Sequence, residues 1–301
     1  MYHKCTLCPR ECHTDRNKRT GFCNVKAQTT VARAALHMWE EPCISGDNGS
    51  GAVFFSGCSL GCVFCQNHRI SGGEIGKEIP VERLTEIFFE LEEQGANNVN
   101  LVTPDHYVPS VCEAVERAHA QGFSLPFIYN CSGYEKTETL RMLEGLIDVY
   151  LPDFKYWKPE TAKRYCNAPD YPERAKDAVA EMVRQTGACV FDGEGRIRKG
   201  TIVRHLLLPG HVGEAKQIID YLYGTYQDDI YISLMNQFTP VLKNDKLAQF
   251  PELHRKVTKR EYDRLVQHAL DIGVTNAFIQ EGETAGESFI PMFDLAGVER
   301  R

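Results

Sequence analysis

The feature that most constrains the fold of this chain is a regular alternation of short apolar runs and amphipathic segments, which begins near residue 52. Short runs of β-branched and aromatic residues predict strands, and segments with a period near 3.6 predict helices. Strands that alternate with helices favour a parallel sheet with right-handed crossovers. The predicted strands are residues 52–55, 99–102, 126–129, 147–151, 202–208 and 230–234, and the predicted helices are 81–93, 111–120, 137–143, 173–185 and 214–223. Six such units predict an α/β fold of the partial (β/α)6 barrel type.

This alternation suggests three parts. We expect a Cys-rich extension at 1–47, the barrel at 48–245, and an extension packed on the barrel at 246–301. In the last part, Thr258 and Glu261 have the spacing of a capping box and predict the start of a helix. A final strand is predicted at 277–280, followed by a Glu-Gly-Glu stretch at 281–283.

Composition excludes several classes of protein. A net charge of −7 argues against a nucleic-acid or anionic-membrane partner. No apolar run is long enough to span a bilayer, and the first residues lack the apolar core of a signal peptide. Twelve cysteines without an export signal therefore indicate a reducing, cytoplasmic location, where metal ligation outranks disulfides.

Three of these cysteines, Cys58, Cys62 and Cys65, have the spacing C-x3-C-x2-C. Close thiolates are soft ligands that suit zinc or an iron–sulfur cluster. Structural zinc normally takes four protein ligands, whereas a cubane cluster held by three cysteines leaves one iron open. His68 follows too closely to act as an independent fourth ligand. The motif therefore favours an open cluster over structural zinc or three inert core thiols.

A second group of cysteines lies at the N-terminus. Cys5, Cys8, Cys12 and Cys23 fall within one short segment, and this density predicts a metal site. A four-cysteine zinc site would stabilise a segment too short to fold by core burial, and a second iron–sulfur cluster fits the same ligands. The sequence favours zinc slightly. The segment is also locally basic, which fits a solvated face or a surface for an acidic partner.

The central motif, with Phe64 directly before Cys65, resembles the radical S-adenosylmethionine (radical SAM) superfamily. The flanking residues 51–55 and 66–67 are similar to the branch that contains pyruvate formate-lyase activating enzyme. This resemblance implies a 4Fe–4S cluster whose open iron binds the amino and carboxylate groups of SAM. It implies cleavage of SAM to methionine and a 5′-deoxyadenosyl radical, which abstracts hydrogen from a substrate. A flavodoxin or ferredoxin is the implied reductant.

The resemblance also implies a set of SAM-facing residues at the strand ends, where barrels of this kind carry their reactive groups. Residues 153–155 match an Asp-Leu-Lys segment of the activating enzymes. At 130–133, Asn and Cys replace Asp and Thr, which removes a charge and a hard ligand that a monovalent cation would need. Residues 204–210 match a fifth strand ending in Pro-Gly. The implied cofactor-binding residues are Phe64, Thr103, Asn130, Ser132, Asp153, Lys155, Arg204 and His205.

One motif is misleading in its position. Residues 71–74 read Ser-Gly-Gly-Glu and match the motif whose backbone binds the SAM amino group in the family. That motif belongs at the end of the second strand, whereas this copy lies shortly after Cys65. We therefore interpret it as a loop turn. Thr103, followed by Pro104, occupies the expected place and could accept the amino hydrogens.

Three hypotheses follow. The first is a radical SAM enzyme that abstracts hydrogen from a macromolecule, with a glycine of a partner protein as the candidate target. The second keeps this chemistry but acts on a small molecule or a peptide. The third is a non-catalytic iron–sulfur or zinc protein that serves electron transfer or scaffolding.

Overall fold

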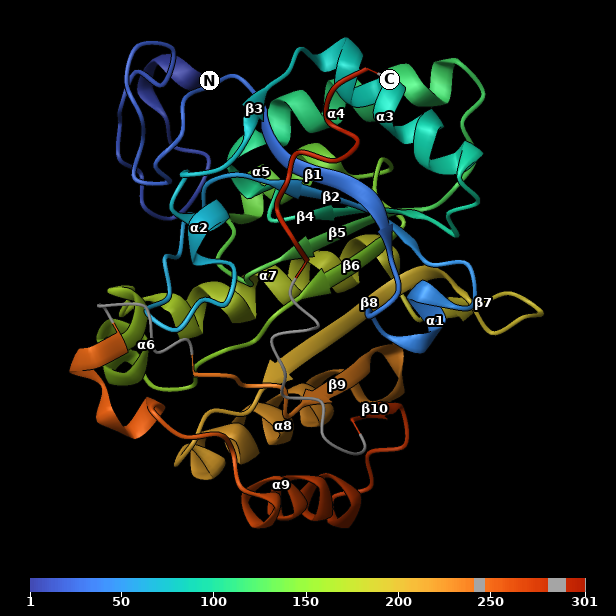
Figure 1. Cartoon of the computed structure of the whole chain (residues 1–301). Helices are drawn as coiled ribbons and strands as arrows, with labels where there is room; N and C mark the ends of the chain where they lie inside the picture. The colour runs from blue at the N-terminus through green and yellow to red at the C-terminus, as the bar shows by residue number, and fades with distance from the viewer. Residues whose placement is uncertain (241–246, 281–290, 301) are drawn as a thin grey trace.

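The computed structural model describes residues 1–240, 247–280 and 291–300. In this part of the chain the strands form one sheet, in the order β10-β9-β8-β6-β5-β4-β2-β1-β3, with β7 paired to β8 beside it. Figure 1 shows this sheet curving through the molecule. The strands are β1 (Thr30–His37), β2 (Ser50–Phe55), β3 (Lys77–Glu78), β4 (Val99–Val102), β5 (Phe127–Cys131), β6 (Val149–Pro152), β7 (Val190–Phe191), β8 (Ile197–Leu206), β9 (Tyr231–Met235) and β10 (Ala277–Ile279).

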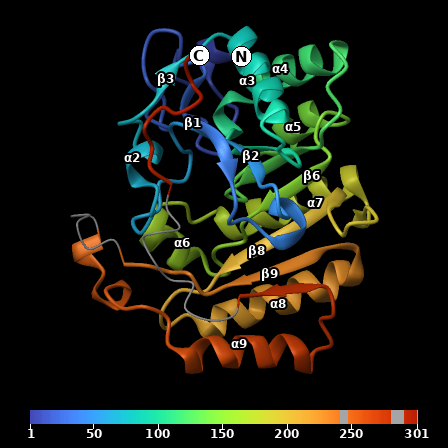
Figure 2. The ribbon, with the colours of Figure 1, turned by 45° about the vertical axis from the view of Figure 1, so that its right-hand side comes forward.

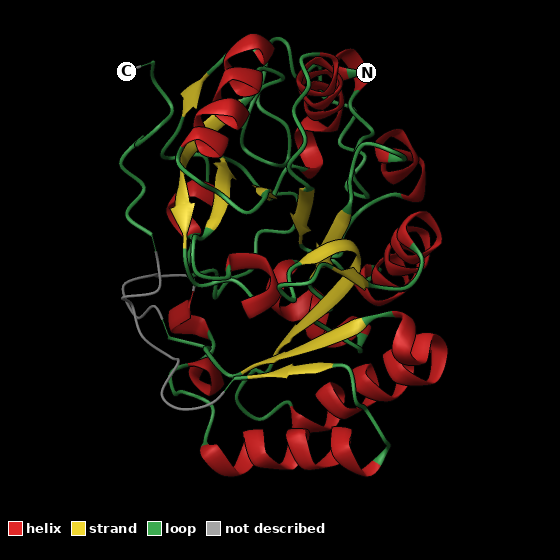
Figure 3. Ribbon diagram, turned by 90° about the vertical axis from the view of Figure 1, so that its right-hand side faces the viewer, coloured by secondary structure: helices red, strands yellow, loops and turns green. Residues whose placement is uncertain are grey.

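The helices lie mainly on the outer face of the sheet (Figure 3). The helices in the described residues are α1 (Pro42–Ser45), α2 (His68–Ser71), α3 (Val81–Glu93), α4 (Val108–Ala120), α5 (Thr137–Leu140), α6 (Pro159–Cys166), α7 (Tyr171–Thr186), α8 (Val212–Tyr226) and α9 (Lys259–Asp271). In α3, the residues Leu84, Ile87, Phe88 and Leu91 are almost fully buried, as the helical period predicts. No helix in this part of the chain is long and apolar enough to cross a membrane.

The neighbouring strands from β2 through β10 are parallel along the sheet path. An open, mostly parallel sheet with helices on its outer face is a partial barrel, so the predicted fold class is confirmed. Because the strands are parallel, the carboxyl ends of β2, β4, β5, β6, β8 and β9 meet at one edge. This edge brings together the polar residues that follow each strand in the sequence.

Both extensions contribute to the sheet. β1 lies within the predicted N-terminal extension but pairs antiparallel with β2, and β10 adds a parallel strand beside β9. Sequence reasoning missed β1 because alanine is a poor indicator of a strand. It also missed α6, although Pro159 at its first turn is a helix-start signal. The capping box at Thr258 does start α9, where both of its reciprocal hydrogen bonds form.

The last described residues return to β1, near the end of the sheet opposite β10. Leu295 and Ala296 exchange backbone hydrogen bonds with β1, so the chain end runs alongside this strand. The buried Arg83 side chain donates to the carbonyls of residues 297–299. Both termini consequently lie at the same end of the molecule, far from α9 (Figure 2). The Glu-Gly-Glu stretch at 281–283 lies outside the described residues.

Candidate active site: a cysteine-lined cavity at the strand ends

The cysteine motif occupies the loop that leaves the carboxyl end of β2. Gly57 begins this loop with a φ of 91°, and a Cβ there would come within 2.6 Å of the Cys23 carbonyl oxygen. Only glycine tolerates both the positive φ and this close approach. From this turn the loop directs Cys58, Cys62 and Cys65 toward a cavity of about 240 Å³.

Each of two sulfurs has a donor close by. The Leu60 amide donates to Cys58 Sγ at 3.3 Å, and the Tyr156 hydroxyl donates to Cys62 Sγ at 3.5 Å. Burial is the main cause that raises the pKa of Cys58 and Cys65. Without a metal these thiols would stay protonated at neutral pH, whereas a bound metal holds cysteine as thiolate. When a metal binds and the two sulfurs become negatively charged thiolates, the Leu60 amide and the Tyr156 hydroxyl stabilise that charge.

Cys166, at the end of α6, lies beside this motif and was missed from the sequence. A hydrogen bond with the Cys166 thiol is the largest cause that raises the pKa of Cys62. The Cys166 thiol also donates to the Ala162 carbonyl at 3.0 Å, as side chains within helices commonly do. Its position about one hundred residues from Cys62 leaves no spacing signal in the sequence.

Seven of the eight predicted cofactor-binding residues line the same cavity as the three cysteines. They are Phe64, Thr103, Asn130, Ser132, Asp153, Lys155 and Arg204. His205 lies elsewhere, because successive side chains of β8 point to opposite faces. Its Nδ1 lies 2.7 Å from the Phe154 carbonyl, and burial lowers its pKa to about 4. His205 is thus a neutral side chain outside the lining of this cavity, and its contact with the cofactor stays a prediction.

A buried network of charges forms one wall of the cavity. Arg204 donates to Asp153 Oδ1 at 2.9 Å, to Glu40 Oε2 at 3.1 Å and to Asn130 Oδ1 at 2.6 Å. Lys155 forms an ion pair with the other oxygen of Asp153. The network fixes the positions of two cations and two carboxylates at the ends of neighbouring strands. Glu40 was missed from the sequence, because it lies 164 residues from Arg204 in a connection after β1.

The pKa shifts in this network follow from burial and charge pairing. Burial opposes ionisation of Asp153, but Arg204 and Lys155 together bring its pKa below the usual range. Burial opposes the charge of Lys155 as well, and Asp153 reverses this effect and raises its pKa. Glu40 differs, because burial raises its pKa despite the neighbouring Arg204. Asp153 therefore carries a negative charge in the cavity at neutral pH.

Thr103 has an unusual backbone at the end of β4. Its φ is 59°, in the left-handed region that β-branched residues rarely adopt. The Thr103 amide donates to the Asn130 carbonyl at 2.8 Å, which holds this conformation. Residues in such conformations cluster at functional sites. The strand end that the family fills with glycines is here a strained threonine that lines the cavity.

The Ser-Gly-Gly-Glu segment ends α2. Gly73 has a φ of 74°, and a Cβ there would meet the Asn24 carbonyl oxygen at 2.8 Å. Gly73 thus lets the end of α2 pack on the N-terminal segment. Ser71 lines the cavity, but Gly72, Gly73 and Glu74 are not part of its lining. This position of the Ser-Gly-Gly-Glu segment agrees with its interpretation as a loop turn.

The N-terminal cysteines lie next to the central loop. Cys5, Cys8 and Cys23 are buried, Cys12 is half-buried, and all four are free thiols. Within the described ranges, no three His, Cys, Asp or Glu side chains are gathered tightly enough for one metal ion. In the same residues, Cys58, Cys62 and Cys65 are likewise not gathered tightly enough for one metal ion. The grouping that a zinc ion would need is therefore not present at the N-terminus in this conformation.

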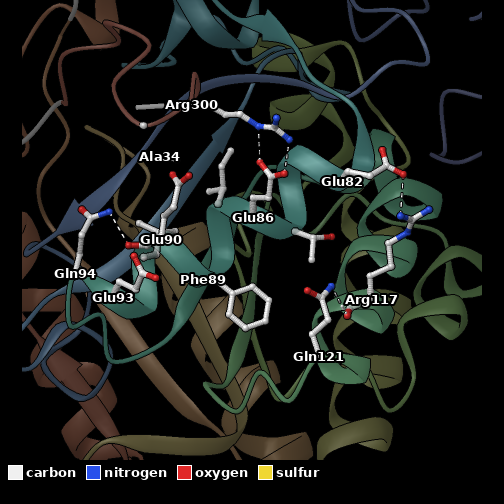
Figure 4. Close-up of a pocket in the computed structure, with 14 residues that line it drawn as sticks. Ala34, Glu82, Glu86, Phe89, Glu90, Glu93, Gln94, Arg117, Gln121 and Arg300 are labelled. Atoms are coloured by element: carbon white, nitrogen blue, oxygen red, sulfur yellow. Dashed lines mark hydrogen bonds and ion pairs between the residues drawn. The ribbon is translucent and has the colours of Figure 1, made fainter.

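A larger hollow, of about 790 Å³, lies between α3 and α4 on the far side of the sheet from the cysteines. Figure 4 shows that its rim is built mainly of acidic and basic side chains. Glu86 pairs with Arg300, and Glu82 pairs with Arg117 at 2.8 Å. Because these exposed charges already have partners and no nucleophile is present, this hollow is a surface groove rather than a reaction site.

The cysteine-lined cavity fits a cluster and a charged organic cofactor. Three soft donors share one lining with fixed charges of both signs, which match the amino and carboxylate groups of an amino acid. No other cysteine lines this cavity apart from Cys131 in the described residues. The Cys131 thiol is buried at the end of β5, so the loop offers three cysteines to a metal in this cavity.

The chain is similar to several known proteins. The chain is 25% identical over 276 residues to the uncharacterized protein MJ0674 of Methanocaldococcus jannaschii, covering 89% of this chain and 75% of the relative. Two solved structures are similar at lower levels. A domain of pyruvate-formate lyase-activating enzyme from Bacteroides vulgatus is 16% identical, with a TM-score of 0.44, and the match covers 62% of this chain and 100% of that domain. Streptococcus suis SuiB bound to S-adenosylmethionine is 13% identical, with a TM-score of 0.48, and the match covers 74% of this chain and 48% of SuiB.

The family assignment depends on a sequence match over residues that include most of the cavity lining. The family described as Radical SAM superfamily matches residues 52–222, which is more than half of the chain. This range contains the three motif cysteines and five of the six strands whose ends meet at the cavity edge, namely β2, β4, β5, β6 and β8. By this match, and with a site whose ligands fit the cluster and the cofactor, the chain belongs to the radical SAM superfamily.

Proposed function

We propose that this protein is a radical SAM enzyme that abstracts hydrogen from a polypeptide, with a glycine of a partner protein as the candidate target. One observation carries the proposal: three cysteines share a cavity with the fixed charges of Asp153, Lys155 and Arg204. When bound, a reduced 4Fe–4S cluster supplies the electron that cleaves SAM to methionine and a 5′-deoxyadenosyl radical.

The side chains around the cavity have distinct tasks in this proposal. Cys58, Cys62 and Cys65 hold the cluster. Asp153 and Lys155 orient the amino and carboxylate groups of SAM, because opposite charges held in place act at no cost of reorganisation. The Phe64 ring packs edge-on against Tyr156, Tyr165 and Phe238 and excludes water from this side.

The shape of the cavity favours a polypeptide over a small molecule. Its volume of about 240 Å³ lies below the range of roughly 300–1,000 Å³ that is usual for small-molecule sites, so a bound cofactor would fill it. The substrate must then approach from outside. Trp39 lines the mouth and is 63% exposed, and exposed aromatic residues are typical of protein-binding surfaces. A chain segment can reach the cavity across this rim.

We further propose a cytoplasmic setting, a flavodoxin or ferredoxin as reductant, and a second metal site at Cys5, Cys8, Cys12 and Cys23. All twelve cysteines of the chain are free thiols, which fits a reducing compartment. The alternatives are radical chemistry on a small molecule or peptide, and a non-catalytic metal protein.

The decisive experiment measures 5′-deoxyadenosine by mass spectrometry after anaerobic reconstitution with iron and sulfide and reduction with dithionite. We expect the wild type to form it and the Cys62→Ser variant to form none, because serine replaces a soft ligand with a hard one. A filled cluster without product would reject both enzymatic proposals. Adding the polypeptide and low-mass fractions of a cell extract separately then distinguishes the two, since the true substrate raises the yield.

A further inference from the structure

The N-terminal segment forms a closed loop that gathers its cysteines. The Cys5 amide donates to the Thr14 carbonyl at 3.1 Å, and the His13 amide donates back to the Cys5 carbonyl at 3.0 Å. Glu11 and His13 both have positive φ values, which lets the chain reverse tightly after Cys8. Three of the four cysteines are buried in a segment with few other apolar side chains. Such a segment needs a stabilising element besides apolar burial.

Arg16 provides independent evidence for an anion at this place. Its side chain is fully buried, and it donates to the carbonyls of His106 and Lys26 at 2.6 Å each. It also donates to the Val25 carbonyl at 3.4 Å and to Cys5 Sγ at 3.9 Å, and its guanidinium group lies over the rings of Tyr2 and Tyr107. No carboxylate forms an ion pair with Arg16 in the described residues. A buried cation requires a compensating negative charge, and metal-bound thiolates supply it.

The N-terminal segment also contacts the central loop directly. The Cys58 amide donates to the Cys23 carbonyl at 3.2 Å, so one hydrogen bond joins a cysteine of each group. Arg10 reinforces this contact by donating to the carbonyls of Ser59 at 2.9 Å and Leu60 at 3.1 Å. A short run of covalent bonds and one hydrogen bond thus connects the two sets of sulfurs. This contact provides a direct path for an electron.

The contact between the two groups of cysteines favours a cluster over a single zinc ion. Zinc requires four ligands at about 2.0–2.3 Å from one centre. The described cysteines of neither group are gathered that tightly, although the central group belongs to a family that carries a cluster. A four-iron core separates its ligands more widely than one ion does. Zinc has no redox chemistry, whereas a redox centre gives the direct contact between the two groups a role.

The outer surface of the segment suits an acidic electron donor. Lys4, Lys18, Arg19 and Lys26 are all exposed, whereas the chain as a whole has a net charge of −7. Cys12 is only half-buried, so one cysteine of the site lies close to solvent. Complementary charge raises the rate at which two proteins meet. Small acidic proteins of the flavodoxin or ferredoxin class fit this surface.

We propose that Cys5, Cys8, Cys12 and Cys23 hold a second iron–sulfur cluster that relays one electron from an acidic flavodoxin or ferredoxin to the site at Cys58, Cys62 and Cys65. The donor is oxidised by one electron, and the central site is reduced by one electron. Arg16 balances the charge of the N-terminal site. The destination of the electron depends on the proposed radical SAM function, but the presence of the second cluster does not.

The first test isolates the N-terminal site in the full chain. A variant with Cys58, Cys62 and Cys65 changed to Ala is reconstituted anaerobically with iron and sulfide. We expect it to retain iron, acid-labile sulfide and an electron paramagnetic resonance signal after reduction. Adding Cys8→Ala and Cys23→Ala should remove all three. Zinc in place of iron, or no metal, would overturn the proposal.

The second test uses the intact protein, so it does not depend on how variants fold. We expect two reducible signals that broaden when both sites are reduced, because close paramagnetic centres couple. Reduction by an acidic flavodoxin should slow in Lys18→Glu/Arg19→Glu but not in Arg260→Glu/Arg264→Glu, whose exposed charges lie on the distant α9. Uncoupled signals, or equal rates in the two variants, would refute the relay.

The two proposals fail in different ways. An N-terminal cluster without formation of 5′-deoxyadenosine would reject the proposed enzymatic function and leave the second cluster in place. SAM cleavage by a protein that holds zinc at its N-terminus would reject the relay and leave the enzymatic function in place.

Discussion

Arg204 and Asp153 face each other across two neighbouring strand ends, with Nε and Oδ1 2.9 Å apart and a backbone bridge between the two residues. Both side chains are largely buried, and Glu40 and Lys155 extend the pair into a network. This pair connects the end of β8 to the end of β6. It therefore both holds the rim of the sheet and fixes charge in the cavity.

Asp153→Ala should destabilise the fold and weaken SAM binding together. Removal of one partner of a buried ion pair leaves the other charge uncompensated and costs roughly 3–5 kcal/mol. Because Glu40 still contacts Arg204, we expect the lower part of this range. Urea denaturation and calorimetric SAM titration measure the two effects. The control is Asp192→Ala, which removes the ion-pair partner of the exposed Arg198 on β8. It should leave SAM affinity unchanged. Unchanged stability in Asp153→Ala would contradict the importance of this pair.

Thr103→Val should weaken SAM binding while the backbone stays in place. Valine keeps the β-branched shape but removes the hydroxyl, and one hydrogen bond contributes about 1 kcal/mol, or somewhat more to a charged amine. The expected loss in affinity is roughly five- to tenfold. Calorimetric titration measures it. Glu74→Gln, outside the cavity lining, is the control; if Glu74→Gln weakens SAM binding and Thr103→Val does not, the amino-group assignment reverses.

Thr103→Gly tests the strained backbone at the same position. Glycine removes the hydroxyl but also relieves a positive φ whose cost is of order 1–3 kcal/mol in a non-glycine residue. We expect Thr103→Gly to be more stable than Thr103→Val and to bind SAM equally weakly. Comparison of urea midpoints and SAM titrations of the two variants checks this. Equal stability would show that the surroundings impose no strain at this residue.

The sequence predicted the elements whose pattern is local. The helix at 81–93 and the strand at 99–102 lie where their periodicity placed them, because burial of one face dictates that periodicity. The helix after Thr258 begins where its capping box predicted. The residues that were missed depend on contacts between distant segments. Glu40 meets Asn130 and Arg204, and Cys166 meets Cys62, only after the sheet closes. No spacing rule relates such residues.

Cys166→Ser should leave the central cluster intact. The Cys166 thiol lies beside Cys62, but it also donates to the carbonyl of Ala162, which a serine hydroxyl can replace. The cluster motif needs three cysteines from its own loop, so we expect iron and sulfide contents equal to those of the wild type. Cys62→Ser should lose both. If Cys166→Ser also loses iron, Cys166 is itself a ligand, and the open position of the site would be closed.

Glu135 should make the stability of the protein depend on pH. Its carboxyl group is buried, neither oxygen has a hydrogen-bond partner within the described residues, and burial, aided by Asp105, raises its pKa to about 8. Unfolded glutamate has a pKa near 4.3, so between these values the folded state keeps a proton that the unfolded state has released. Stability must therefore fall as pH rises through this window, by at most about 1.4 kcal/mol per pH unit.

Glu135→Gln removes this titration and keeps the size of the side chain. Relative to the wild type, we expect the variant to gain stability steadily between about pH 5 and about pH 8, because only the wild type must keep an acid protonated there. Anaerobic urea denaturation at several pH values measures the difference. Glu138→Gln, on the exposed side of α5, is the matched control and should follow the wild type. Parallel curves for Glu135→Gln and the wild type would show that Glu135 ionises normally, and the buried carboxylate would then require a bound cation or water for compensation.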